Sequence, residues 1–427
     1  MIAPTAPRRE SGFSLVELLV AMLIGLIGII IMLQVFENAE GVRRTTVSGG
    51  DAQQNGALAL YVLERDLRNA GMGVNDIGLM TPPCNMIGYD GARSTPNFPP
   101  VGSPIPLAPV QIVAGGNATT PDQVNVFYGS QTMAATTNLV VPVVMTANPN
   151  ALTVGTTFGY RPGDLLLLFQ PNPGAAVQNC IFMEVTSTNA NQVFHAPGAY
   201  TLANSGKSTT ARFNPPDFTG TNAAMALTYN GNKVVTNTVT RVYNLGNLHD
   251  GLDFPATQNQ RMPAYNTYAV QNNTTACPSS WCLSISNAFA VAGGSPTFSA
   301  LADNIVHMRA DYGLDDGLPA GTAGDGILDR FLDPAAFDAL PAATKPWQYV
   351  IAIRIAVVAR SALIEKPGPG VACDGSTPFP TWSGNTAATR GFDLSTIPVP
   401  AGSSWDCYRY RVFETIVPVR NSIWKAS

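Results

Sequence analysis

The sequence predicts an α+β protein, in which one long N-terminal helix packs on an antiparallel β-sheet within an enlarged β-rich body. Three observations predict it. Residues 13–36 are almost entirely apolar, short strand-like segments recur after residue 122, and Gly and Pro are frequent, at 39 and 34 of 427 residues. Beyond the helix, a chain of this length can form one large or two small domains.

The apolar segment 13–36 contains a single ionisable residue, Glu17. As a helix it is ~36 Å long, which is enough to cross a bilayer. Arg8 and Arg9 precede it and favour a cytoplasmic N-terminus with the rest of the chain exported. A carboxylate inside a membrane costs roughly 2.5 kcal/mol at the helix centre and less near an end. Glu17 lies one turn inside, so a function is expected for it.

An apolar N-terminal segment of this kind is also compatible with a secretory signal, a twin-arginine signal or a plain single-span anchor. A secretory signal has a shorter apolar core followed by a small-residue cleavage site, and residues 38–40 make a poor site. The residues after Arg8 and Arg9 do not support a twin-arginine signal. Hydropathy alone leaves the plain anchor open.

The helix is expected to continue as an amphipathic half. Leu60, Leu63, Leu67 and Ala70 repeat at helical spacing and should face a sheet. On the solvent side, Glu64 and Arg68 should form an i,i+4 pair, and Gly71 and Gly73 should end the helix.

A break or kink is expected near Gly49. Gly49 and Gly50 each cost a helix ~1 kcal/mol relative to Ala. Asp51, with Gln54 three residues later, has the pattern of a new N-cap.

The body is expected to be rich in strands. Residues 74–122 are rich in Pro, Gly and Asn and are expected to form loops. The clearest strands are 348–360 and 408–421, which should pair antiparallel and pack on the helix. Weaker strand signals cover 123–128, 139–145, 164–170, 181–187, 224–229, 233–243, 282–285 and 305–312.

The six cysteines indicate disulfides, because an even number in an exported body favours pairing. We expect Cys277–Cys282 to close a small local loop and Cys373–Cys407 to close a larger one. The remaining two cysteines would then form Cys84–Cys180. Free buried thiols are the alternative. Zinc binding has weak support, because no second cysteine pair matches the first and the three histidines are scattered.

Two stretches, 311–317 and 324–329, are dense in Asp and Gly. Calcium binds several oxygen atoms on loops with sharp Gly turns. The candidate ligands are Asp315, Asp325 and Asp329, and apart from this candidate calcium site no cofactor is expected. The EF-hand pattern is not met. A solvated turn rich in Asp is the competing interpretation, favoured slightly over calcium.

Other functions lack support in the sequence. Charged residues make up 12% and the net charge is −4, so no basic patch supports nucleic-acid binding. No nucleophile elbow, phosphate-binding loop or metalloprotease motif is present. No catalytic residue is predicted, and the protein is not expected to be an enzyme.

Residues 8–22 resemble the processing site of type IV prepilins. A short charged leader ends at Gly12, an apolar helix begins at Phe13, and Glu17 is the fifth residue after the expected cut. The resemblance implies cleavage after Gly12 by a prepilin peptidase and N-methylation of Phe13. Glu17 would then pair with the free amine of Phe13, on its own chain or on a neighbour, during assembly. Alternatively, Glu17 completes a capping box with Ser14.

Further blocks at 54–60, 66–71, 354–361 and 408–421 extend the resemblance. Together the blocks are similar to the PilW-type minor pilins of type IV pili, relatives of the J-type minor pseudopilins of type II secretion. Residues 90–300 carry no resemblance. Family members often have a Cys soon after the helix, whereas the first here is Cys84, so no family disulfide is carried over.

The resemblance implies a type IV pilin-like fold with four parts: a leader over 1–12, a transmembrane half-helix over 13–36, an amphipathic half over 37–73, and a periplasmic or extracellular head over 74–427. It implies a single-pass inner-membrane protein, with a cytoplasmic N-terminus, that later joins a pilus on the cell surface.

The implied partners are the prepilin peptidase, other minor pilins and the major pilin. The implied function is priming of pilus assembly at or near the tip, with links to twitching motility. Because the subunit at the extreme tip usually lacks the Glu, Glu17 suggests a place beneath or beside another subunit. The alternatives are a minor pseudopilin of type II secretion and an adhesin acting through residues 90–300.

Overall fold

The computed structural model describes residues 12, 14–74, 84–93, 97–98, 105–131, 138–139, 151–169, 179–216, 228–229, 232–233, 241–253, 262–272, 275, 277, 281–290, 297–319, 321–341, 347–364, 373, 377–385, 387–399 and 403–423. Arg8, Arg9, Phe13 and Trp424 lie outside these residues, as do most of the strands predicted over 139–145 and 224–229.

The N-terminal helix, α1 (Leu15–Asn69), is continuous over 55 residues. The break predicted near Gly49 is therefore wrong, and Asp51 lies inside the helix. A Cβ atom placed on Gly49 or Gly50 would meet nothing within 4 Å, so no packed neighbour forces a bend. A break would also leave backbone groups without helical partners, which outweighs ~1 kcal/mol per Gly. The helix ends where predicted, at Gly71 and Gly73, whose φ angles are +78° and +80°.

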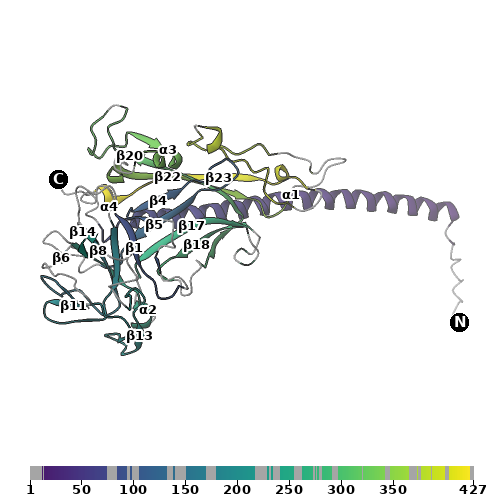
Figure 1. Cartoon of the computed structure of the whole chain (residues 1–427). Coiled ribbons are helices and arrows are strands. Elements are labelled where there is room, and N and C mark those ends of the chain that lie inside the picture. Colours follow the sequence, from purple (N-terminus) through teal and green to yellow (C-terminus); the bar gives the residue numbers. More distant parts are fainter. Residues whose placement is uncertain are drawn as a thin grey trace, which may run out of the picture.

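The two halves of α1 have opposite surroundings. Leu15–Arg43 is long and apolar enough to cross a membrane, and none of its most apolar window is buried. Figure 1 shows this half projecting from the head, while the second half runs along the head. The predicted division of the helix into an apolar and an amphipathic half matches this difference in burial.

Two antiparallel sheets pack around the second half of α1. The first has the strand order β21-β20-β22-β23 and the second β19-β18-β17-β5-β4. Asn304, with φ of 55°, turns the chain from one sheet into the other. The strands are β4 (Val110–Val113), β5 (Gln123–Tyr128), β17 (Ala264–Asn272), β18 (Trp281–Asn287), β19 (Ser299–Asp303), β20 (Ile305–Leu314), β21 (Arg330–Leu332), β22 (Val350–Arg360) and β23 (Tyr410–Pro418).

The predicted pairing of the two clearest strands is confirmed. β22 and β23 are adjacent and antiparallel, and both contact α1. Leu63, Leu67 and Ala70 are fully buried in the core that α1 shares with both sheets. Leu60 is only partly buried. The ring of Phe413 on β23 lies where a Cβ atom of Gly56 would stand, so Gly56 permits close contact between strand and helix.

A third sheet occupies the middle of the chain, in the order β2-β1-β9-β8-β16-β6 with β3 paired to β1. One hydrophobic core lies wholly within this part of the chain, and a second core also includes Phe127 of β5, Tyr265 of β17 and Phe289. Figure 1 places β1, β8 and β11 away from the projecting half of α1. The prediction of loops throughout 74–122 is therefore wrong, since β1 to β4 lie there. The strands of this sheet are β1 (Asn85–Tyr89), β2 (Asn97–Phe98), β3 (Ile105–Pro106), β6 (Asn138–Leu139), β8 (Asp164–Phe169), β9 (Asn179–Glu184) and β16 (Arg241–Asn247).

Small elements complete the head. They comprise β7 (Ala151–Thr153), β10 (Ser187–Thr188), β11 (Gln192–Phe194), β12 (Ala199–Thr201), β13 (Ser208–Thr210), β14 (Thr228–Tyr229), β15 (Asn232–Lys233), α2 (Asp250–Asp253), α3 (Pro334–Asp338), α4 (Arg420–Ile423) and three short 3-10 helices, Trp347–Tyr349, Ala388–Arg390 and Trp405–Cys407.

All six cysteines are paired, in the three pairs that the sequence favours. Cys84–Cys180 joins the start of β1 to β9, which run parallel. Cys277–Cys282 closes a local loop before β18. Cys373–Cys407 ties the long connection between β22 and β23.

Candidate assembly site and the contacts that hold it

Glu17 lies in the first turn of α1 and is exposed. Ser14 is the N-cap residue, and its carbonyl accepts a hydrogen bond from the backbone N–H of Leu18 at 3.1 Å. The Ser14 side chain makes no capping hydrogen bond within the part of the chain that the structure describes. Half of the predicted capping box is therefore missing. The other predicted partner, the amine of Phe13, lies outside the described residues.

The apolar surface around Glu17 is extensive. From Leu15 to Phe36 the large apolar side chains are between 45% and 77% exposed. A contiguous apolar surface of this kind marks a contact with lipid or with protein. Glu17 thus lies near the end of an apolar surface that lipid or another protein would be expected to cover.

At the other end of α1, Asp66 is a buried carboxylate on the helix face that meets the head. It accepts hydrogen bonds from Asn266 Nδ2 at 2.7 Å, the Tyr268 hydroxyl at 2.5 Å and the Tyr128 hydroxyl at 3.4 Å. Burial and the nearby Asp66 charge raise the pKa values of Tyr268 and Tyr128, so both hydroxyls stay protonated and donate. These bonds fix the helix on β5 and β17.

Backbone contacts hold the helix end. Gly71 N–H donates to the Phe127 carbonyl at 2.8 Å, and Gly129 N–H donates to the Met72 carbonyl at 2.7 Å. Asn421, just after β23, donates through Nδ2 to the carbonyl of Ala70 at 2.9 Å. The end of α1 is thereby attached both to β5 and to the C-terminal segment.

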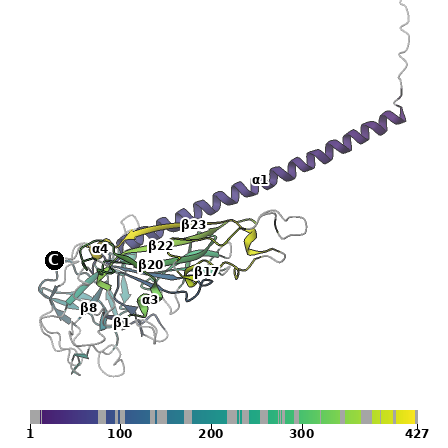
Figure 2. The same cartoon turned by 90° about the horizontal axis from the view of Figure 1, so that it is seen from above.

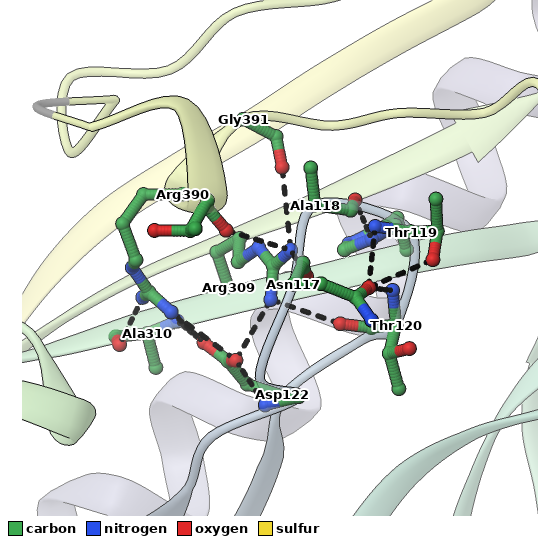
Figure 3. Close-up of polar contacts among 12 residues, drawn as sticks. Asn117, Ala118, Thr119, Thr120, Asp122, Arg309, Ala310, Arg390 and Gly391 are labelled. Carbon is green, nitrogen blue, oxygen red and sulfur yellow. Dashed lines mark hydrogen bonds and ion pairs between the residues drawn. The ribbon is translucent and has the colours of Figure 1, made fainter.

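A buried ionic network joins three distant segments (Figure 3). Asp122 precedes β5, Arg309 lies on β20, and Arg390 ends a short 3-10 helix. Arg309 Nη1 and Arg390 Nη1 each lie 2.9 Å from an oxygen of Asp122. Arg309 Nη1 also donates to the carbonyl of Thr120 at 2.9 Å. The network therefore fixes the β4–β5 loop and the segment 388–391 to one face of β20.

The network continues along β20 and β22. Arg390 Nη2 is 2.8 Å from Asp311, and Arg354 Nη2 is 2.6 Å from the same carboxyl group. Burial raises the pKa of Asp311, and the two guanidinium groups oppose that effect. Burial, and next the charge of Arg309, lower the pKa of His307 to about 3, so His307 is neutral at physiological pH.

The predicted calcium ligands do not converge on one point. Asp315 accepts hydrogen bonds from the backbone N–H groups of Gly324, Asp325 and Gly326 at 2.8, 3.2 and 2.8 Å. Asp329 accepts from Gly317 N–H at 2.7 Å. These contacts describe a stapled turn, the competing interpretation. Calcium binding stays a prediction.

Among the described residues, Cys373, Asp406 and Cys407 form the one group of three possible metal ligands within 4.8 Å. The two cysteines share a disulfide, so their sulfur atoms are not available as thiolate ligands.

The middle region, which we define as β1 to β3 together with the elements between β5 and β17, also contains buried polar contacts. Glu184 accepts hydrogen bonds from the Tyr200 hydroxyl at 2.6 Å and Arg212 N–H at 2.7 Å, and lies 3.1 Å from His249 Nε2. Arg212 also pairs with buried Asp90 at 2.7 Å. Each carboxylate is satisfied locally, which indicates structural roles.

The sequence predicted Glu17 but missed Asp66, Asp122, Arg309 and Arg390. A signal for Asp66 existed, since it lies at helical spacing from Leu63 and Ala70 on the buried face. Asp122 is 187 residues from Arg309 and 268 residues from Arg390 in the sequence. No local sequence pattern connects these three residues. Of the five tryptophans, Trp347 and Trp382 are buried, Trp281 and Trp405 are partly buried, and Trp424 lies outside the described residues.

Comparison with known families gives two matches. Residues 7–33 match the family model described as the prokaryotic N-terminal methylation motif. This motif, the projecting apolar helix and the antiparallel head define a membrane-anchored protein of the pilin class. Residues 267–421, from β17 to α4, match the family model described as type IV pilus-assembly protein W. The two matches, one at the N-terminal helix and one in the C-terminal part of the head, are those of a PilW-type minor pilin of type IV pilus systems. No curated protein and no solved structure matches it.

Proposed function

We propose that the chain is cut after Gly12, methylated at Phe13 and inserted into a type IV pilus, where it helps to prime assembly at or near the tip. The observation that carries the proposal is the exposed apolar half of α1. Lipid covers this surface in the inner membrane before assembly, and α1 helices of the major and minor pilins cover it in the fibre.

Glu17 favours the move of α1 from the membrane into the fibre. A carboxylate in an apolar, low-dielectric environment is strongly disfavoured unless an opposite charge neutralises it. Cleavage after Gly12 creates an amine at Phe13, about one helical turn from Glu17. An amine on a neighbouring chain satisfies the carboxylate only when the two helices are in the correct register. This need favours a place beneath or beside another subunit.

The test is the N-terminal peptide of fibres sheared from cells. Mass spectrometry should find a peptide that begins at methylated Phe13. Glu17→Gln should still be processed but should reach the fibres at least tenfold less often, which corresponds to ~1.4 kcal/mol of lost pairing. Glu37→Gln, on the same helix beyond the apolar segment, is the matched control.

Two outcomes would end the proposal. One is uncut chain beginning near Met1, found only in membranes, which would make this an anchored protein. The other is normal recovery of Glu17→Gln in the fibres, which would remove the assembly role of the carboxylate.

The middle region supports adhesion as a second function. It has a sheet and one hydrophobic core of its own and lies outside both family matches. Removing residues 90–300 would be a poor test, because β4, β5, β17 and β18 lie within them. Ala264 pairs with Tyr128 across β5 and β17, so a short turn can replace 130–262, with Cys84→Ser to avoid a lone thiol. This variant should keep piliation and lose adhesion. Unchanged adhesion would reject the second function.

A further inference from the structure

Arg360, the last residue of β22, is a buried arginine without a carboxylate partner. It is 6% exposed, and no carboxylate oxygen of the described residues lies within 4.0 Å of its guanidinium group. The other two buried arginines of the described residues, Arg309 and Arg390, each lie 2.9 Å from an oxygen of Asp122. Because a buried charge is costly unless it is paired, the unpaired charge of Arg360 needs a further explanation.

The contacts that Arg360 does make compensate its charge only weakly. The guanidinium group lies over the ring of Tyr408, 4.4 Å from the ring centroid. Its one hydrogen bond among the described residues runs from Nη2 to Oδ1 of Asn304 at 3.5 Å, and Nε is buried without a partner. Burial lowers the pKa of Arg360, but a guanidinium group stays charged in proteins. A cation–π contact and one long hydrogen bond do not replace the hydration that a buried cation loses.

Two N–H donor groups remain for a ligand. Nη1 of Arg360 and Nδ2 of Asn304 make no hydrogen bond within the part of the chain that the structure describes, and neither is one of its buried unpartnered atoms. Both therefore keep some contact with solvent. They belong to the two side chains that already meet through Nη2 and Oδ1, so they lie close together. A guanidinium group beside an amide donor suits the oxygen atoms of an oxyanion.

The backbone holds these two side chains in place. Asn304, at the turn between β19 and β20, donates its N–H to the carbonyl of Trp281 at 2.8 Å. Arg360 donates its N–H to the carbonyl of Asn304 at 2.8 Å and pairs with Tyr410 across β22 and β23. Because both residues are ordered before binding, little conformational entropy is lost when a ligand binds.

The pair Arg360 and Asn304 lies toward the end of the head from which α1 projects. Along β23, Phe413 lies against Gly56 of α1, and Tyr410, the partner of Arg360, comes three residues earlier in the strand. Figure 2 shows the yellow start of β23 beside α1, on the side of the head toward the projecting half of the helix. While the chain is anchored in a membrane, phospholipid headgroups lie on this side of the head.

We propose that Arg360 and Asn304 form a binding site for an oxyanion of the phosphate type, supplied as free phosphate or as the headgroup of an anionic phospholipid. A phosphate group carries up to two negative charges and several acceptor oxygens, so it can accept from both Nη1 and Nδ2. The bound anion supplies the missing counter-charge of Arg360. It also links the end of β22 to the turn before β20. The site does not depend on a place in the fibre, so it goes beyond the proposed function.

The first test is thermal unfolding of the full-length chain in a non-ionic detergent, without phosphate and with millimolar phosphate. Chloride at the same ionic strength is the reference. A ligand that binds only the folded form raises Tm, and a rise of about 2 °C is expected. Arg360→Gln should abolish the rise. Arg411→Gln is the matched control, because Arg411 is exposed on the neighbouring strand, and it should leave the rise unchanged.

Asn304→Asp tests the same site without removing the arginine. The new carboxylate would lie beside Arg360 and supply a counter-charge within the chain, and Asp tolerates the φ angle of 55° at this position. The variant should have a higher Tm than the unaltered chain in phosphate-free buffer and should no longer respond to phosphate. A lower Tm, or an unchanged response to phosphate, would overturn the proposal.

Lipid nanodiscs distinguish the two sources of the anion. The full-length chain is compared in phosphate-free nanodiscs of phosphatidylglycerol and of phosphatidylcholine, whose headgroup has no net charge. A rise in Tm with phosphatidylglycerol that requires Arg360 identifies the headgroup as the source, whereas a rise with inorganic phosphate alone identifies the free ion. The proposal fails if neither raises Tm. It also fails if Arg360→Gln shows the same rise, because the anion is then adventitious only.

Discussion

Two regions of the head differ in how they are held together. The pilin core consists of α1, β4, β5 and β17 to α4. The middle region consists of β1 to β3 and the elements between β5 and β17. The pilin core ties distant segments to α1 and β20 through buried charges, with Asp66 and Arg309 at the centre. The middle region pairs its buried charged side chains with one another, as Glu184 and Asp90 do with Arg212, and Arg212 also donates to the carbonyls of Phe289 and Ala288 in the pilin core.

This difference indicates which part of the head serves the proposed role in assembly. The PilW match covers only residues 267–421, all within the pilin core. The polar contacts that orient α1 come from β5, from β17 and from Asn421, all within the same core. The middle region lies at the end away from the projecting helix, and it meets the pilin core at β5, at β17 and after β18.

The largest expected effect is that of Arg309→Met. It leaves Asp122 with one guanidinium in place of two and leaves backbone carbonyls without a donor. Loss of one partner from a buried ionic network typically costs about 3–5 kcal/mol. Urea unfolding of the full chain in detergent should show this loss, and fibres should contain little of the variant.

Arg212→Met is the matched change in the middle region. Arg93 still pairs with Asp90 at 2.7 Å, so a smaller destabilisation is expected, with normal recovery in fibres. Equal loss of both variants from fibres would refute the division into two regions.

Asp66→Ala should have the next largest effect. It leaves Asn266, Tyr268 and Tyr128 without their acceptor, and each unsatisfied buried group costs about 1–3 kcal/mol. A total near 3 kcal/mol is expected in the same unfolding measurement. Glu64→Ala is the control on the same helix, because its pair with Arg68 is partly exposed and should contribute less than ~1 kcal/mol. A similar small loss for both would show that apolar packing alone holds α1.

A buried carboxyl group of the middle region, Asp164, should make the free energy of unfolding depend on pH. Burial raises the pKa of Asp164 to about 6, and hydrogen bonds from Asn244 and Arg161 only partly oppose it. The stability that Asp164 contributes is present below its unfolded pKa of about 4 and is lost as the pH rises through 6. The loss is roughly 2–3 kcal/mol.

Asp164→Asn removes this titration. The difference between the unfolding free energies of the two proteins should change between pH 4 and 6 and stay constant above it. The buried His195, whose pKa is lowered to about 4, titrates in both proteins and cancels in the difference. Parallel curves would mean that Asp164 is ionised in the folded protein throughout this range.

The sequence predicted the pilin core better than the middle region, for a physical reason. The apolar half of α1, the buried Leu63 and Leu67, and the pair β22–β23 all follow from side-chain periodicity. The break predicted at Gly49 was wrong, because the low helix propensity of Gly costs less than the loss of the backbone hydrogen bonds of a continuous helix. The ionic network escaped prediction, because contacts between Asp122 and Arg390 depend on the tertiary fold and leave no local pattern.

The Asp-rich loop after β20 provides the smallest expected effect and decides between two interpretations. If Asp315 is a staple for three backbone N–H groups, Asp315→Ala should lower Tm equally with and without calcium. If Asp315, Asp325 and Asp329 bind calcium, millimolar calcium should raise the Tm of the unaltered chain and leave Asp315→Ala unchanged, because a ligand stabilises only the form that binds it. Asp325→Asn separates the two further. The Asp325 side chain accepts only the N–H of Ile327 among the hydrogen bonds of the described residues, so its loss should matter little unless an ion is bound.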